Sequence, residues 1–208
     1  NYNTIMDELY NYIEGWWRNK IELTKRNSQF KLDNDEKKYL VSICSKLELK
    51  KDKILIKPGT FVNKQFFIIK GCLRSFCTDS KGKEHTLQFA VKDHWISDYI
   101  SLYSNKKSTL FIQATTDSLV LCFNTLDIYK LINKYPNISL LHRKSLERHI
   151  AAQGERIINQ LQLTAEERYN LFLKNYPNIN QLALNYHIAS FLGITQQSLS
   201  RIRSDFKI

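Results

Sequence analysis

YHIASFLGITQQSLSRIRSDF, residues Tyr186–Phe206, contains two short helical patterns on either side of a glycine. The residues predicted to face inward from the first helix are Ile188, Ala189 and Leu192. Gly193 stands where a helix commonly ends in a left-handed residue, and Thr195 can cap a second helix over 196–206. Two helices and a short turn containing Gly form the helix-turn-helix pattern, although a plain helical hairpin with a solvated polar face has the same spacing.

The second helix presents side chains that suit the edges of DNA bases. A Gln can contact adenine and an Arg can contact guanine with two hydrogen bonds each, and further Arg side chains and hydroxyls suit phosphates. The candidate DNA-binding residues are Thr195, Gln196, Gln197, Ser198, Ser200, Arg201 and Arg203. Its apolar anchors are Leu199 and Ile202.

Length and charge restrict the class of protein. The chain has 208 residues, of which 43% are hydrophobic, which fits one large or two small folded domains. No apolar run is long enough for a transmembrane helix. The net charge of +11 favours anionic partners, but only five basic and three acidic residues lie in 163–208. Charge therefore permits DNA binding without establishing it, and no membrane partner is predicted.

The cysteines and the N-terminus indicate a reducing compartment. The four cysteines show no C-x-x-C spacing; they are Cys44, Cys72, Cys77 and Cys122. We therefore expect free thiols in the cytoplasm, with a metal or redox role as the alternative. The N-terminus lacks the features of a signal peptide. No catalytic triad, phosphate-binding glycine loop or metal-ligand spacing is present, so we predict neither an enzyme nor a metal site nor a cofactor.

The first half of the chain changes from helical to strand patterns. Helical spacing covers 4–26 and continues through LDNDEKKYLVSICSKLELKK, residues 32–51, where Asp33 is a natural cap. From Lys53 to Asn124, short β-branched and aromatic runs alternate with turn residues. DSKGKE between LRSFC and HTLQFAV indicates a hairpin, and two more strands flank TTDS. Evenly spaced short strands predict a small antiparallel barrel or roll.

A long helix follows the predicted roll. After a short helix that Pro136 ends, some twenty-five residues run without proline. Apolar or small residues recur on one face of this helix at Leu146, Ile150, Gly154, Ile157 and Leu161. This seam could pack on its own domain, but a long helix between two folded parts is better placed to pair with a second copy of itself. We therefore expect a homodimer.

These patterns give an α+β chain in three parts. Residues 1–137 hold the N-terminal helices and an antiparallel β-roll of the jelly-roll kind, which would act as a sensor. Residues 138–162 form the dimerisation helix. Residues 163–208 form a helix-turn-helix domain, whose start is marked by a capping box from Thr164 to Glu167.

The order of these parts resembles the Crp/Fnr family of bacterial transcription regulators. The residues that carry the resemblance are ILIKPGTFVNKQFFIIKGCLRSF (54–76), DSKGKEHTLQFA (79–90) and, most specifically, IASFLGITQQSLSRIR (188–203). The resemblance implies a cyclic-nucleotide-binding-like domain and a homodimer that recognises a two-fold symmetric operator in double-stranded DNA through the helix Gln196–Phe206. It also implies that the protein recruits or blocks RNA polymerase.

The effector positions depart from the family's pattern. The family uses a Gly-Glu pair and, ten residues on, an Arg followed by Ser or Thr, where the Arg neutralises a cyclic phosphate. The matching pair here is Ser97-Asp98, and Ser108-Thr109 stands where the Arg-Ser would be. Lys107 could supply charge, but it would point the opposite way if Ser108 begins a strand. On the long helix the matching residue is Gln153.

Loss of the arginine argues against cyclic AMP, because a buried phosphate without a cationic partner costs several kcal/mol. The pocket would then bind an unidentified small molecule or be filled by its own aromatic residues Trp95, Tyr99, Tyr103 and Phe111. The histidines His142 and His149, seven apart on the long helix, are expected to be solvated or to face a dimer partner. A second hypothesis remains open: a cyclic-nucleotide-type signalling or interaction module whose terminal helices only pack.

Overall fold

The computed structural model describes residues 33–205, so the helices predicted over 4–26 lie outside the described part of the chain. The strands of this range are β1 (Cys44–Leu49), β2 (Ile54–Ile56), β3 (Lys64–Lys70), β4 (Cys72–Thr78), β5 (Glu84–Val91), β6 (Trp95–Ile96), β7 (Phe111–Ala114) and β8 (Ser118–Asn124). Its helices are α2 (Asn34–Ser42), α3 (Tyr99–Ser104), α4 (Thr125–Lys134), α5 (Pro136–Gln162), α6 (Ala165–Asn175), α7 (Ile179–Leu182), α8 (Asn185–Leu192) and α9 (Gln196–Asp205).

The strands form two four-stranded sheets in which every pairing is antiparallel. One sheet has the order β1-β8-β3-β6 and the other the order β2-β7-β4-β5. Apolar side chains from both sheets share one core, to which Phe66, Ile68, Leu73, Ile112 and Val120 belong. The predicted β-roll is confirmed, and the fold class is α+β as expected.

The predicted hairpin joins β4 to β5, and Gly71 makes the tight connection from β3 into β4. The β4–β5 register runs from Cys72 opposite Val91 to Thr78 opposite Glu84, with a bulge at Ser75/Phe76. Gly71 has φ of +89°, a left-handed conformation in which glycine is favoured.

The helical pattern predicted over 32–51 is wrong in its second half. Helix α2 begins after an Asp33 capping box, as expected, but it ends at Ser42, and Cys44–Leu49 is strand β1. All six residues of β1 pair with β8. Lys, Leu and Glu are good helix formers, but tertiary pairing overrides such weak local preferences.

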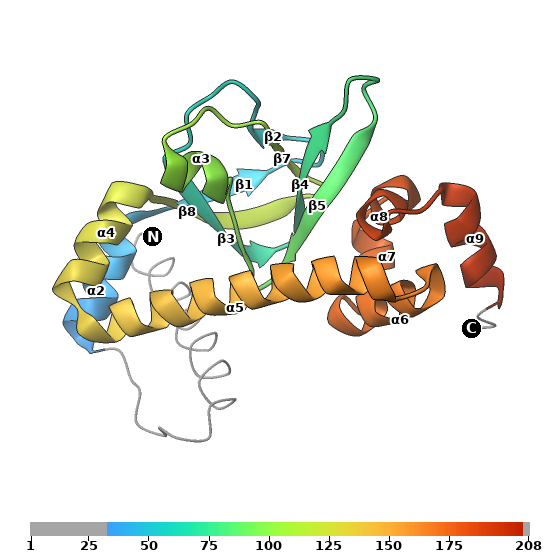
Figure 1. The fold of residues 1–208 in the computed structure, drawn as a ribbon. Coiled ribbons are helices and arrows are strands. Elements are labelled where there is room, and N and C mark those ends of the chain that lie inside the picture. Colours follow the sequence, from blue (N-terminus) through green and yellow to red (C-terminus); the bar gives the residue numbers. More distant parts are fainter. Residues whose placement is uncertain (1–32, 206–208) are drawn as a thin grey trace, which may run out of the picture.

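Helix α5 runs along the roll from α2 and α4 at one end to α6–α9 at the other (Figure 1). Pro136 occupies its first turn, where the missing N–H costs nothing. Helices α2 and α4 close one end of the roll around Leu40, Phe67, Leu121 and Leu131.

The terminal helices have their own core, which continues into the roll. Phe172, Ile188, Leu192 and Leu199 pack together there, with Ile179 and Ile202. Cys72 of β4 and Phe89 of β5 belong to the same cluster. The helix-turn-helix unit is therefore docked on the sheet that contains β4 and β5.

Alanine substitutions at Gly82 and Gly71 can separate the energetic cost of backbone strain from the cost of a steric clash. Gly82 also has a positive φ, of +77°, but a Cβ added there meets nothing within 4 Å. We expect Gly82→Ala to cost about 1–2 kcal/mol of unfolding free energy from the left-handed conformation alone.

Gly71→Ala adds a Cβ that would meet the backbone oxygen of Asp117 at 2.7 Å. It should therefore cost about 1–3 kcal/mol more than Gly82→Ala. Urea denaturation of the two variants and the parent chain measures the difference in unfolding free energy. Equal losses of unfolding free energy in the two variants would contradict the close packing of Gly71 against Asp117.

Candidate DNA-contacting helix and effector position

The hairpin of α8 and α9 has the geometry that its sequence predicts. Gly193 follows α8 with φ of +71° and ψ of +31°. Thr195 precedes α9, and its Oγ1 accepts a hydrogen bond from the backbone N–H of Ser198 at 3.1 Å. The inward residues of both helices are buried, with Leu199 only 1% exposed.

The first turns of α9 present polar side chains to solvent. Gln196, Gln197, Ser200 and Arg201 are exposed, whereas Ser198 is half-buried and its hydroxyl is bonded to that of Thr195 at 3.0 Å. Within the described residues, the guanidinium of Arg201 has no hydrogen bond or ion pair. Figure 1 places α9 at the end of the molecule farthest from α2 and α4, outward of α8. The N-terminus of α9 also carries partial positive charge from the helix dipole.

Arg203 differs from the rest of the predicted DNA-binding set, because its guanidinium bonds within the terminal domain. Its Nε donates to the Tyr169 hydroxyl at 2.9 Å. Its two terminal nitrogens donate to the side-chain oxygens of Asn185 and Asn180, each at 2.6 Å. Arg203 therefore joins α9 to α6, α7 and α8, and its donors are not directed at solvent.

The Ser97-Asp98 pair is buried and its polar atoms are used internally. The Ser97 hydroxyl donates to the Lys64 carbonyl at 2.7 Å. Asp98, which is 1% exposed, caps α3 by accepting the backbone N–H groups of Ile100 and Ser101 at 3.0 and 3.1 Å. This carboxylate thus stabilises the start of a helix.

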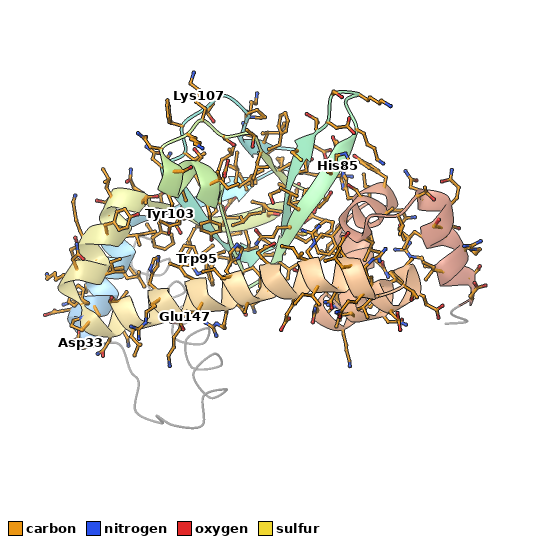
Figure 2. The ribbon with its side chains drawn as sticks, in the orientation of Figure 1. Asp33, His85, Trp95, Tyr103, Lys107 and Glu147 are labelled. Atoms are coloured by element: carbon orange, nitrogen blue, oxygen red, sulfur yellow. The ribbon has the colours of Figure 1, made fainter. Side chains whose placement is uncertain are left out.

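The Lys107-Ser108-Thr109 segment lies in a loop, so Ser108 does not begin a strand as considered above. Strand β7 starts only at Phe111. The backbone of Ser108 instead pairs with Gly59 and Thr60, at 2.8 Å in each direction. Ser108 is buried, whereas Lys107 is exposed, and Figure 2 shows Lys107 on the outer loop, on the side of the roll away from α5.

Gln153 lies elsewhere, on the part of α5 that faces β5 and α6. It lines a cavity together with Gln88, Arg156 and Tyr176. The structure therefore does not bring all the predicted effector residues into one site.

The predicted seam on α5 is mostly exposed in the single chain. Ile150 is 70%, Ile157 63% and Leu161 81% exposed, and Gly154 is exposed as well. Leu146 is half-buried and contributes to a small apolar cavity against the roll. Large apolar residues this exposed on one helix face are typical of an interaction surface.

Comparisons with known proteins agree with this geometry. Residues 46–135 match the family model of the cyclic nucleotide-binding domain. Residues 46–135 are therefore similar to a cyclic nucleotide-binding domain, and most of the chain shares the fold of the three solved structures described next. No curated protein matches the sequence.

Three solved structures illustrate the shared fold. FixK2 from Bradyrhizobium japonicum has a TM-score of 0.69 at 16% identity, over 78% of this chain and 84% of that one. A CooA variant from Carboxydothermus hydrogenoformans has a TM-score of 0.62 at 24% identity, over 81% and 78%. A regulator from Eubacterium rectale assigned to the Crp/Fnr family has a TM-score of 0.64 at 16% identity, over 85% and 84%.

Aromatic residues of the cyclic nucleotide-binding domain mainly fill its own interior. Trp95 packs against Phe67 and Phe123, each with ring centroids 5.2 Å apart, and Figure 2 shows Trp95 between the sheets and α5. Phe111 stacks on Phe76 at 4.9 Å.

Tyr99 packs in a tilted arrangement against His149 of α5, with ring centroids 4.9 Å apart, and burial raises the pKa of the Tyr99 hydroxyl. The expectation that His142 and His149 are solvated or face a partner is wrong. Both are half-buried toward the cyclic nucleotide-binding domain, and burial lowers the pKa of each. His142 lines the small apolar cavity together with Trp95 and Leu146.

Several polar residues join the terminal helices to the cyclic nucleotide-binding domain, and none of them was predicted from the sequence. The Ser190 hydroxyl of α8 accepts the Thr86 N–H and donates to the Glu84 carbonyl, both at 2.8 Å. Arg156 of α5 donates to the carbonyls of Thr86 and Phe191 at 3.2 and 3.3 Å. These partners lie 35 to 106 positions apart in the sequence, so no local pattern could identify them.

Beneath α8, Arg74 of β4 is almost fully buried. Its Nη2 forms an ion pair with Glu84 at 2.6 Å and a hydrogen bond with Gln113 at 2.8 Å. The guanidinium also stacks over the Phe76 ring at 3.9 Å. This buried cation and its partners form a polar cluster beneath the docked helix, in which Arg74 Nη1 has no hydrogen-bond partner within the described residues.

All four cysteines are free thiols, as expected. Burial raises the pKa of Cys72 and of Cys44 to about 11, which keeps both protonated and unreactive at neutral pH. Among the described residues, no group of three or more His, Cys, Asp or Glu side chains could hold a metal ion. None of the helices in residues 33–205 is both long and apolar enough to cross a membrane.

His187 makes the docking of α8 sensitive to acid. It is buried, and neither ring nitrogen has a hydrogen-bond partner within the described residues. Burial, followed by the nearby charges of Arg74 and Lys51, lowers its pKa from 6.5 to about 3. Above pH 6.5 the ring is neutral in both the folded and unfolded chains. Below pH 6.5 only the unfolded chain takes up the proton, so the free energy of unfolding should fall between pH 6.5 and pH 3.

His187→Leu removes this titration and the two unpaired nitrogens. We expect the variant to gain stability over the parent chain progressively as the pH is lowered from 7 to 4.5, measured by urea denaturation. The remaining titratable groups are the same in both proteins, so their contributions to the free energy of unfolding cancel in the comparison. A stability difference that does not change with pH would contradict the lowered pKa.

Proposed function

We propose that this protein is a homodimeric transcription regulator of the Crp/Fnr type, which reads a two-fold symmetric DNA site through α9. The observation that carries the proposal is the outer face of α9, where Gln196, Gln197 and Arg201 are exposed while the inward apolar residues of the hairpin are buried. Glutamine and arginine at the start of such a helix can contact adenine and guanine in the major groove. Thr195, Ser198 and Ser200 supply hydroxyls for phosphates or bases, and Arg203 supports α9 from within.

The three proposed roles follow the domain boundaries drawn from the sequence. We assign sensing to residues 1–137, dimerisation to 138–162 and DNA binding to 163–208. Two copies that pair through the exposed seam on α5 would present two α9 helices, and productive spacing is about one turn of B-DNA, roughly 34 Å. Contact with RNA polymerase would follow from the same role.

We further propose that cyclic AMP is not the effector. Asp98 is occupied as the cap of α3, and Ser108 stands at the position where an arginine would neutralise a phosphate. The exposed Lys107 lies on the outer loop and cannot replace that arginine (Figure 2). Burial of a cyclic phosphate here would leave its charge without a cation.

The alternative, a signalling module whose terminal helices only pack, draws support from the core that α8 shares with the roll. Packing accounts for the inner face of α8, but it does not account for the uncommitted side chains of α9. Variants of α9 therefore separate the two functions.

Arg201→Ala tests the base-reading role. We expect a loss of about 1–3 kcal/mol in binding to the preferred DNA site, or about 5- to 150-fold in affinity, with an unchanged melting temperature. The site is first obtained by selection from random duplexes, and fluorescence anisotropy measures the affinity.

Arg203→Ala is the contrasting variant, and it should lower the melting temperature because its donors hold three helices together. If Arg201→Ala lowered the melting temperature as well as the DNA affinity, the result would support the packing alternative instead.

Ile157→Glu tests the dimer seam. A carboxylate on each copy would be desolvated opposite its equivalent, so we expect the dimer to weaken by at least about 100-fold, measured by sedimentation velocity. Phe61→Glu is the matched control, because Phe61 is also 63% exposed but lies in the loop between β2 and β3. A dimer that survives Ile157→Glu, or that Phe61→Glu disrupts equally, would contradict pairing through α5.

A further inference from the structure

A cavity of about 230 Å³ lies where the cyclic nucleotide-binding domain, α5 and the terminal helices meet. We call it the junction cavity. Strand β5 contributes Leu87 and Gln88, and α5 contributes a face that includes Ala152, Arg156 and Asn159. Phe172 of α6, Tyr176 directly after α6 and Phe191 of α8 also line it. On α5 these residues recur at helical spacing on the side away from the exposed seam, so the cavity does not depend on the dimer contact.

Arg156 places an uncompensated positive charge in the wall of this cavity. Its terminal nitrogens are held by the carbonyls of Leu87, Thr86 and Phe191, and its guanidinium carbon lies 4.3 Å from the centre of the Phe191 ring. Its buried Nε has no hydrogen-bond partner, and no carboxylate of the described residues lies within ion-pair distance of it. Burial lowers its pKa, as expected for a cation that lacks an acidic neighbour.

The remaining polar groups do not neutralise this charge. Arg168, which also lines the cavity, donates to the carbonyls of Leu163 and Leu192 and has no acidic partner either. Glu155 is the acidic member of the lining, and it is exposed. The wall therefore combines two guanidinium groups with one solvated carboxylate and several neutral amides.

The apolar part of the cavity wall consists largely of aromatic rings. Phe172, Tyr176 and Phe191 pack with ring centroids 5.0 to 6.4 Å apart, so one wall is an aromatic cluster. Aromatic faces and edges favour a planar ring as their partner. The volume is below the range of about 300–1,000 Å³ typical of pockets for drug-sized ligands, so the occupant must be small.

We propose that the junction cavity binds a small organic acid, in which one anionic group meets the guanidinium cluster and a planar ring packs on the aromatic wall. This site is separate from Ser97 and Asp98 and from the outer face of α9, and it does not depend on the proposed DNA-binding function. Because its wall includes residues of β5, α5, α6 and α8, the occupant contacts several of the elements that hold the terminal helices in their docked position. Binding therefore stabilises the docked arrangement.

The test uses the full chain and isothermal titration with three probes. Indole-3-acetate carries both a ring and an anion, indole-3-acetamide is its neutral counterpart, and inorganic phosphate is an anion without a ring. We expect indole-3-acetate to bind once per chain, at least about tenfold more tightly than either of the others, and to raise the melting temperature.

Ala152→Leu supplies the matching variant, because it fills the cavity from an exposed position of α5 without removing a polar contact. It should weaken binding of indole-3-acetate at least about tenfold. Ala151→Leu, the adjacent exposed position outside the lining, should leave binding unchanged. Arg156 itself is unsuitable for the test, because its loss would also remove its contacts with three carbonyl groups.

Four results would overturn the proposal. Indole-3-acetate that does not bind at millimolar concentration would contradict an acid site. If the acid and the amide bound with equal affinity, the guanidinium groups would not contribute to recognition. If phosphate bound as tightly as indole-3-acetate, the ring would not contribute. Binding that Ala152→Leu and Ala151→Leu affect equally would place the ligand outside the junction cavity.

Discussion

The free edge of strand β5 is the constraint on which the arrangement of the molecule depends. In its sheet β5 pairs only with β4, so one side of its backbone needs other hydrogen-bond partners. Ser190 of α8 satisfies the N–H of Thr86 and the carbonyl of Glu84, and Arg156 of α5 satisfies the carbonyls of Thr86 and Leu87. A sheet edge that would otherwise invite aggregation is thereby used to hold two helices.

The parts of the fold that rest on local chemistry could be predicted from the sequence. Gly193, Thr195 and the apolar residues of the two flanking helices fix the α8–α9 hairpin through backbone conformation, capping and burial within some twenty residues. The β4–β5 hairpin and the capping box at Thr164 depend on equally short patterns. The assignment of 44–49 to a helix failed because its neighbour β8 lies about 75 positions away, and pairing with β8 outweighs helix propensity.

The candidate site was predictable only where its residues are consecutive. The polar face of α9 follows directly from helical spacing, whereas the internal use of Arg203 depends on Asn180 and Asn185, which lie on other helices. Gln153 matched an effector position by sequence, but in the structure it lines the junction cavity together with Gln88. Long-range packing of this kind leaves no trace in composition or periodicity.

Arg156 determines how a change in one part can affect the others. It lies on the helix that carries the exposed seam, bonds to the edge of β5 and stacks on Phe191 of α8. A ligand alters DNA binding only through its different affinity for two arrangements of the terminal helices. In the docked arrangement the β5 edge is bonded to Ser190 and Arg156, and Phe89 shares an apolar core with Phe172. An effector that favours or opposes this arrangement would change the free energy of these contacts, together with others such as the hydrogen bond from the Thr115 hydroxyl to the Leu182 carbonyl.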